Sequence, residues 1–386
     1  MVKSAGFQNQ LSEIFSSRIQ KPIMPNAKKY NNIKLVAGIA KGIVSFILIL
    51  LFVKLNYSQM LEDILRGYFS NDYLVLIGFV IAAGLFSSIL FFPLKYYLEY
   101  YLEHKYNLSN QTIYRWLWED FKGLLVGGVI GIPILLLFYF VLLTFKEMWW
   151  LVFAVAMFFI SVLLAKILPI FILPIFYKIS PIDNDDLRLR IIDLCTLVGM
   201  KVENVFAFNM SKNTKKANAA FTGLGKTKRI ILGDTLLNEY SHEEIETVIA
   251  HELGHFKKKH IIKNIAIGTV SSFLTFYLIA TLYSNSINWF GFESIIIIAA
   301  LPILSLWAMI IGLITTPISN IISRKYEYEA DQFAIEITNN ADAFINTLNK
   351  LTEQNLGDKE PHPVIEWFFY SHPSIKNRIS HLEDQL

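Results

Sequence analysis

Cysteine is almost absent from this sequence. The single cysteine, Cys195, cannot form an internal disulfide, and several thiolates cannot share a metal. Charged side chains are also scarce, because Asp, Glu, Lys and Arg make up 17% of the 386 residues and leave a net charge of +3. Such a small excess does not favour a general electrostatic grip on nucleic acid. Any bound metal must therefore be held by histidine and carboxylate side chains.

A cleavable signal peptide and internal repeats are also missing. Residues 1–32 are polar and of mixed charge, without the short apolar core of a signal peptide. No fixed period and no low-complexity tract is present, which disfavours a solenoid. Hydrophobic residues, in contrast, make up 54% of the chain, and its mean hydropathy is +0.43. This composition predicts an integral-membrane protein.

Six apolar runs are long enough to cross a bilayer, which requires about 20 residues. They cover 35–55, 73–94, 123–145, 148–176, 261–283 and 294–318. The fourth run is longer than one crossing needs, and Pro169 and Pro174 predict a kinked or tilted end. We expect Lys166, in the same run, to reach the interface or a wet cavity rather than the substrate.

Basic residues alternate between successive loops. The N-terminal segment contains Arg18, Lys21, Lys28 and Lys29, whereas the loop 284–293 has no Lys or Arg. By the positive-inside tendency, both termini and the long segment 177–260 are expected on the cytoplasmic side. The sequence thus predicts a cytoplasmic N-terminal segment, a four-span membrane region, a cytoplasmic segment, two further spans and a cytoplasmic C-terminal segment. Their predicted limits are 1–34, 35–176, 177–260, 261–318 and 319–386.

A small region of mixed helix and strand is predicted between the fourth and fifth spans. Apolar residues recur at helical spacing over 185–198. Strand-like runs follow at 204–208 and 228–232, with 217–224 between them and a turn at 225–227. Ser241 and Glu244 then have the spacing of a capping box, so we expect a helix to begin there.

This helix contains the string His-Glu-Leu-Gly-His at residues 251–255. Because His251 and His255 are four residues apart, they share one helix face and can bind one ion. Glu252 lies on the flank of that face, where it can take a proton from a metal-bound water without becoming a ligand. The string predicts the metal site of a protease.

A second helical stretch, 324–335, supplies carboxylates for this site. Glu327 and Asp331 share a face, whereas Glu329 points elsewhere. A catalytic zinc uses three protein ligands and keeps one position for water. By this reasoning, one of the two facing acids binds the metal, and the other orients a ligating histidine or anchors the helix.

Together these residues resemble the type I CAAX prenyl endopeptidases, which are multi-spanning membrane zinc proteases with a chamber enclosed by helices. The resemblance extends along most of the chain. Besides the two metal-site stretches it covers 103–122 with Gln111, Thr112 and Asp120, 169–181, Asn218-Ala219-Ala220, 234–237 and Ser371-His372-Pro373.

The resemblance implies an all-α integral membrane fold. About six transmembrane helices would enclose a chamber, and a cytoplasmic zinc-metalloprotease domain would contain a small β-sheet. It implies one Zn²⁺ bound by His251, His255 and Glu327, which selects Glu327 over Asp331. Glu252 would be the general base. Asp331 would support the reaction from behind the ligands, paired with Arg378.

Two further roles follow from the same resemblance. His372 is expected to stabilise the oxyanion of the tetrahedral intermediate. The segment Asn218-Ala219-Ala220 is expected to form an edge strand to which a substrate peptide adds. The remaining histidines are assigned no role; they are His104, His242, His260, His362 and His381.

The sequence also differs from the family. Eukaryotic members have an additional N-terminal span, and we expect six spans here rather than seven. The expected substrates are lipidated or apolar peptides cleaved near their C-termini, at the cytoplasmic side of a multi-pass cell (inner) membrane, with membrane lipids as further partners. Two alternatives stay open: a quality-control protease without lipid specificity, and a catalytically silent scaffold. A transporter is disfavoured because intramembrane charge is sparse.

Overall fold

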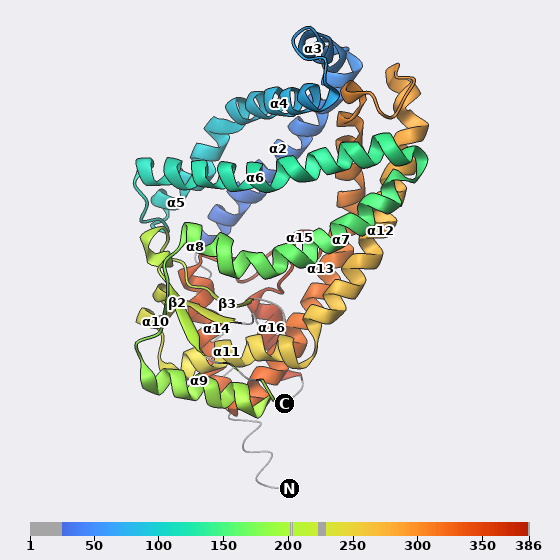
Figure 1. The fold of residues 1–386 in the computed structure, drawn as a ribbon. Coiled ribbons are helices and arrows are strands. Elements are labelled where there is room, and N and C mark those ends of the chain that lie inside the picture. Colours follow the sequence, from blue (N-terminus) through green and yellow to red (C-terminus); the bar gives the residue numbers. More distant parts are fainter. Residues whose placement is uncertain (1–24, 201, 203, 223–228, 385–386) are drawn as a thin grey trace.

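The structure is a computed structural model that describes residues 25–200, 202, 204–222 and 229–384. The turn expected at 225–227 lies outside the described residues, as do residues 1–24, which form most of the expected N-terminal segment. Long helices occupy one half of the molecule, and shorter helices surround a small sheet in the other half (Figure 1). The expected fold class is confirmed.

Five helical stretches in the described part of the chain are long and apolar enough to cross a membrane. They are Asn26–Lys54, Asp72–Lys105, Ile113–Phe176, His260–Phe290 and Ile298–Thr338. The third stretch reverses direction at the 3₁₀ turn η2 (Lys146–Met148), so that α6 (Ile113–Phe145) and α7 (Trp149–Ile167) are its two arms (Figure 1). The third and fourth predicted spans are therefore present within one uninterrupted stretch.

Two of these stretches contain a π-helical turn. The helix α4 (Asp72–Lys95) continues through η1 (Tyr96–Tyr101) into α5 (Leu102–Lys105). The helix α7 continues through η3 (Leu168–Ile172) into α8 (Leu173–Phe176). Proline has no N–H for the helical ladder, and Pro169 lies in η3. The irregular end expected for the fourth apolar run is located there.

The last apolar run differs from its prediction at both ends. Residues 294–297 form no regular helix, and η7 (Ile298–Ala300) precedes α13 (Pro302–Thr338). The helix does not end at 318, where hydropathy falls, because the polar residues that follow are also compatible with a helix. The last span and the stretch 324–335 are consequently one continuous helix.

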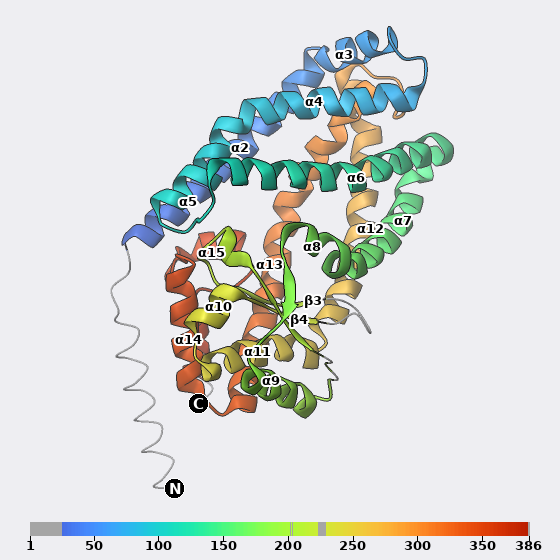
Figure 2. The ribbon, with the colours of Figure 1, turned by 60° about the vertical axis from the view of Figure 1, so that its left-hand side comes forward.

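Two further long helices lie in the half of the molecule that contains the membrane spans. They are α2 (Pro25–Lys54) and α12 (His260–Ser286), with the short helix α3 (Tyr57–Arg66) following α2. Figure 2 shows α12 and α13 running from the membrane half into the half with the sheet. The metal-site stretch of α13 is thereby joined rigidly to a membrane span.

The sheet has four strands in the order β1-β2-β4-β3. Its strands are β1 (Ile179–Pro181), β2 (Val205–Phe208), β3 (Ala219–Thr222) and β4 (Arg229–Gly233). The central pair β2 and β4 is parallel, and both outer strands pair antiparallel. Strand β3 thus lies at an edge of the sheet, whereas β1 had no counterpart among the expected strands.

Short helices cover the sheet and complete this half of the molecule. The sheet packs against α9 (Asp185–Leu197) and α11 (His242–Lys257) through one apolar core that includes Ile191, Ile230 and Ile249. The other short helices are α10 (Asp234–Glu239), α14 (Ala341–Gln354), α15 (Pro363–Phe369) and α16 (Ile375–Glu383). A second core joins α11 to α13, α14 and α16. The helix α11 therefore lies between two cores, with its position fixed from both sides.

Candidate metal centre

The helix α11 begins where its capping box predicts. Oγ of Ser241 accepts a hydrogen bond from the backbone N–H of Glu244 over 3.2 Å, and Oε2 of Glu244 accepts one from the N–H of Ser241 over 2.9 Å. Both bonds satisfy N–H groups that have no partner inside the helix. The apolar residues Ile245, Ile249 and Leu253 then face the core of the sheet. The helix register that results leaves His251 and His255 on another face.

A glycine allows α11 to approach α13 closely. A Cβ atom at Gly254 would lie 2.9 Å from Cα of Ala330 and 3.1 Å from its carbonyl oxygen. These are backbone atoms that cannot rotate away. Glycine at this position thus permits a crossing at which Glu327, one turn before Ala330, comes level with the two histidines.

The side chains of His251, His255 and Glu327 meet at this crossing. The Nε2 atoms of the histidines lie 3.2 Å apart, and each lies 3.4 Å from a carboxylate oxygen of Glu327. Three ligands of a tetrahedral zinc ion, each about 2.0–2.1 Å from it, would lie about 3.3 Å from one another. Oε2 of Glu327 is buried and accepts no hydrogen bond from the described residues, a costly arrangement unless a cation compensates it. These three residues can hold a metal ion.

Asp331 and Arg378 lie behind His251. Nδ1 of His251 lies 2.8 Å from Oδ1 of the fully buried Asp331. Arg378 donates from Nε to Oδ2 of Asp331 over 2.7 Å and also contacts Oδ1 through Nη2. Burial disfavours the charged imidazolium, but the contacts with Asp331 and Glu327 overcome it and raise the pKa of His251 to about 9. The carboxylate of Asp331 faces Nδ1, which leaves Nε2 directed at Glu327.

The exposed His372 approaches from the loop between α15 and α16. Its Nδ1 lies 2.9 Å from Oε2 of Glu327, although the alignment falls short of a hydrogen bond. Two polar contacts hold the loop: Arg324 donates to the carbonyl of Tyr370 over 2.6 Å, and Glu366 accepts from the N–H of Ser374 over 3.0 Å. The loop therefore presents an imidazole next to the candidate metal ligands.

A pocket of about 410 Å³ opens beside these residues. Its walls include His251, Glu252 and His372 together with Asn218 and Ala219. The pocket thus joins one candidate metal ligand and two candidate catalytic side chains to the start of the edge strand β3, while Asp331 and Ala220 do not line it.

Comparisons with known proteins agree with this geometry. The profile of peptidase family M48 matches residues 181–386. The chain belongs to peptidase family M48. A second profile, described as the CAAX prenyl protease N-terminal region with five membrane helices, matches residues 5–178. Within the described residues of that range, the long apolar helices are α2, α4, α6 and α7.

Individual relatives extend the family assignment over the whole chain. A metalloprotease of Bacillus subtilis, YhfN, is 30% identical over 93% of this chain and 85% of its own. CAAX prenyl protease 1 of Saccharomyces cerevisiae is 32% identical over 77% of this chain and 69% of its own. The crystal structure of S. mikatae Ste24p matches with a TM-score of 0.84 at 27% identity, over 99% of this chain and 96% of that chain. This M48 protein is a multi-pass membrane metalloendopeptidase.

The candidate metal centre has a second support, His260, to which no role was assigned from the sequence. Nδ1 of His260 lies 2.9 Å from Nδ1 of His255, and Nε2 of His260 lies 3.0 Å from Oε2 of Glu329. The His260 ring is buried and stacks on Tyr326 with 4.1 Å between centroids. Lys259, with φ 60°, separates α11 from α12 and turns His260 back towards His255. Glu329 points away from the ligand atoms, as expected, and towards His260. The contact of His260 with His255 depends on the backbone conformation between two helices, which produces no periodic pattern in the sequence.

Three other histidines without an assigned role have structural contacts. Both ring nitrogens of His104 lie 2.7 Å from backbone carbonyl oxygens. His242 contacts Asp186, and Nδ1 of His362 accepts from the N–H of Val364 at the start of α15. These contacts explain the three residues without a catalytic role.

Proposed function

We propose that this M48 enzyme is a zinc-dependent endopeptidase of the CAAX prenyl protease type. The observation that carries the proposal is the pocket lined jointly by His251, Glu252, His372, the first residue of β3, Ala219, and the residue before it, Asn218. A peptide that pairs with the edge of β3 would place a carbonyl group between the metal ligands and His372. The relatives named CAAX prenyl protease 1 support a substrate cleaved near a lipidated C-terminus.

In this proposal zinc is held by His251, His255 and Glu327. When bound, zinc polarises the substrate carbonyl and lowers the pKa of a water molecule. Glu252 is half-buried in the pocket wall, takes a proton from the attacking water and delivers it to the leaving amine.

Three other residues support the reaction. His372 donates a hydrogen bond to the oxyanion. Asp331, held by Arg378, keeps the ring of His251 in one orientation. The balance is that of hydrolysis: one C–N bond breaks, one C–O bond forms, and the proton of water goes to the amine.

We place the site on the cytoplasmic side of a cell membrane. The loop between α5 and α6 lies against the half with the sheet, where Ser109 pairs with Thr214, and Lys105 together with Arg115 at its ends supports this orientation. The segments 177–260 and 319–386 then form one catalytic unit. The first segment contains α11, and the second contains the C-terminal half of α13 and His372. Protease digestion of inverted vesicles should cleave these segments, and protection from digestion would contradict the orientation.

Glu252→Gln tests the chemistry. The amide cannot accept the proton, so peptide cleavage should fall by a factor of at least about 10²–10⁴, while the bound zinc, measured by atomic emission, stays at the wild-type content. Glu243→Gln, the same change at an exposed position of α11, is the matched control and should keep full activity. Full activity of Glu252→Gln would refute the general-base assignment.

Substrate class is tested with one peptide sequence, with and without a C-terminal prenyl group. A CAAX-type protease should cleave the prenylated form with the higher kcat/KM. Equal cleavage of both forms would instead favour a quality-control protease without lipid specificity.

A further inference from the structure

The side chain of Asn355 holds the backbone that leads into the edge strand β3. Oδ1 of Asn355 accepts from the N–H of Ala217 over 2.9 Å, and Nδ2 donates to the carbonyl of Ala217 over 3.1 Å. The amide therefore makes the donor and acceptor pair that a neighbouring strand would otherwise make. Ala217 is buried and immediately precedes Asn218 and Ala219, which line the pocket beside the metal ligands.

On its other side the same backbone meets strand β4. The N–H of Gly233 donates to the carbonyl of Asn218 over 2.9 Å, and a Cβ atom at Gly233 would also lie 2.9 Å from that oxygen. The backbone at the start of β3 thus contacts Gly233 on one side and the side-chain amide of Asn355 on the other. Removal of either contact would leave the strand free to shift.

Asn355 is itself tied to the membrane helix α2. It follows the last residue of α14, and the next residue, Leu356, has φ 54°, in the left-handed region. Nδ2 of Asn31, on α2, donates to the carbonyl of Leu356 over 2.8 Å. Asn31 and Asn355 also line the pocket that contains His251. A continuous set of polar contacts therefore connects a membrane helix with the edge strand.

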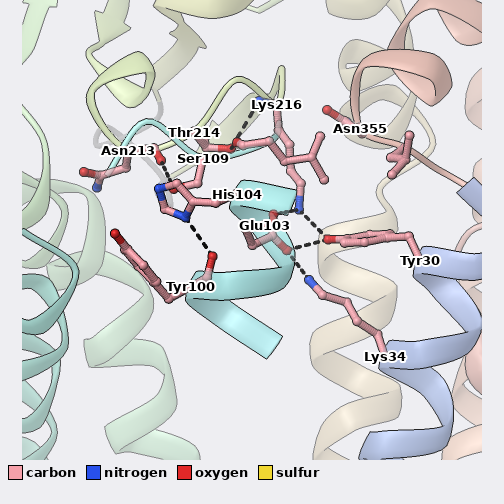
Figure 3. Close-up of polar contacts among 12 residues, drawn as sticks. Tyr30, Lys34, Tyr100, Glu103, His104, Ser109, Asn213, Thr214, Lys216 and Asn355 are labelled. Carbon is pink, nitrogen blue, oxygen red and sulfur yellow. Dashed lines mark hydrogen bonds and ion pairs between the residues drawn. The ribbon is translucent and has the colours of Figure 1, made fainter. Parts of the chain in front are cut away.

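A second tie reaches the preceding residue, Lys216. Its Nζ lies 3.0 Å from Oε2 of Glu103, at the junction of η1 and α5, and the same carboxylate contacts Tyr30 and Lys34 of α2 (Figure 3). The carbonyl of Lys216 accepts from Thr235 over 2.8 Å. Glu103 is largely buried, so its ion pairs are poorly screened and hold the segment firmly.

We propose that Asn355 is a positioning residue for the peptide substrate. By holding the backbone of Ala217, Asn355 determines where Asn218 and Ala219 lie relative to the metal ligands. Asn31 and Glu103 connect this segment to the membrane helices. The inference rests on the proposed function, in which the substrate pairs with β3. A misplacement of about 1 Å in such a site lowers the rate about 10²-fold.

Asn355→Asp is the direct test. The carboxylate can still accept the hydrogen bond from the N–H of Ala217. Its second oxygen cannot donate to the carbonyl of Ala217 as the amide does, so the start of β3 should move. We expect KM to rise about tenfold or more for peptides long enough to pair with β3, because the strand edge with which they pair is displaced from the metal ligands. Zinc content and Tm should stay close to wild type.

Asn349→Asp is the matched control. It is the same change on α14, where Nδ2 of Asn349 donates to the carbonyl of Ile345 over 3.1 Å within the helix. This variant should keep the wild-type KM. Asn31→Ala, which loosens the loop without touching Ala217, should raise KM in the same direction by a smaller factor, and it serves as the second variant if Asn355→Asp does not fold.

Peptide affinity is measured separately from turnover by binding of the same peptide to Glu252→Gln protein with and without Asn355→Asp. Weaker binding in the double variant at unchanged zinc content supports the positioning role. Equal binding, or a loss of zinc and Tm in proportion to the loss of binding, overturns it. If wild-type enzyme loaded with zinc cleaves no peptide while the binding difference persists, the proposed function fails and the positioning of the edge strand stands.

Discussion

Replacing Gly254 with alanine adds one methyl group where α11 and α13 are closest. The new Cβ would lie 2.9 Å from Cα, 3.1 Å from the carbonyl oxygen and 3.3 Å from Cβ of Ala330, whereas ordinary contacts lie at 3.4–4 Å. Because backbone atoms are in the way, the helices must separate by about 0.5–1 Å to restore contact distances of this kind.

The energetic terms oppose each other. Alanine in a helix interior is favoured over glycine by about 0.5–1 kcal/mol, and overpacking costs about 1–3 kcal/mol. The net loss of folding stability is therefore modest, about 1 kcal/mol. The geometric effect is larger, because Glu327 moves with α13 relative to the histidines, and sites of this kind tolerate only about 0.5 Å. We expect the affinity for zinc to fall by a factor of about 10–100.

Competition with a chromogenic chelator measures this affinity directly. Gly268→Ala is the control: it adds the same methyl group to α12, where, apart from its chain neighbours and the adjacent backbone of α12, the described residues place no atom within 4 Å of the new Cβ. The control should keep the wild-type affinity. If Gly254→Ala binds zinc within a factor of about two of wild type, then the closeness of the crossing does not set the metal geometry and the reasoning is refuted.

Two further predictions concern the histidines. His260→Ala removes the group that orients the ring of His255, so zinc should dissociate about 10–100-fold more readily, whereas His242→Ala, at the start of α11, should leave chelator competition unchanged; equal behaviour of the two variants would contradict the support role. In protein stripped of metal by a chelator, the pKa of His251 is raised to about 9, so its proton competes with the metal below that pH. Zinc affinity should therefore rise about tenfold per pH unit until the pH approaches this pKa. If His251→Gln does not reduce this dependence of zinc affinity on pH, the proton of His251 is not the competitor.

Local features of the site could be predicted because they depend on neighbours in the sequence. The capping box of Ser241 and Glu244 determines where α11 begins, and helical periodicity then puts His251 and His255 on one face. Apolar runs likewise predict membrane spans, since the bilayer imposes their length. Hydropathy was less informative about helix ends, because α13 continues as a polar helix far beyond its apolar run.

Contacts between distant segments could not be read from such patterns. Helical spacing allows either Glu327 or Asp331 as the third ligand, and only the family resemblance selects Glu327. In the structure the α11–α13 crossing places Glu327 at the Nε2 atoms and Asp331 at Nδ1 of His251. The choice depends on which turn of α13 faces Gly254, and helical spacing within one segment contains no information about that.

The sequence by itself determined a membrane protein with a metal-binding helix, because hydropathy, capping and helical spacing act over a few turns of one segment. The tertiary structure decided which side chains support that helix. His260 is brought behind His255 by a left-handed residue between two helices, and Asn355 reaches Ala217 across 138 positions of the chain. These contacts arise when separate helices pack and bury their apolar faces, so the order of residues alone does not reveal them.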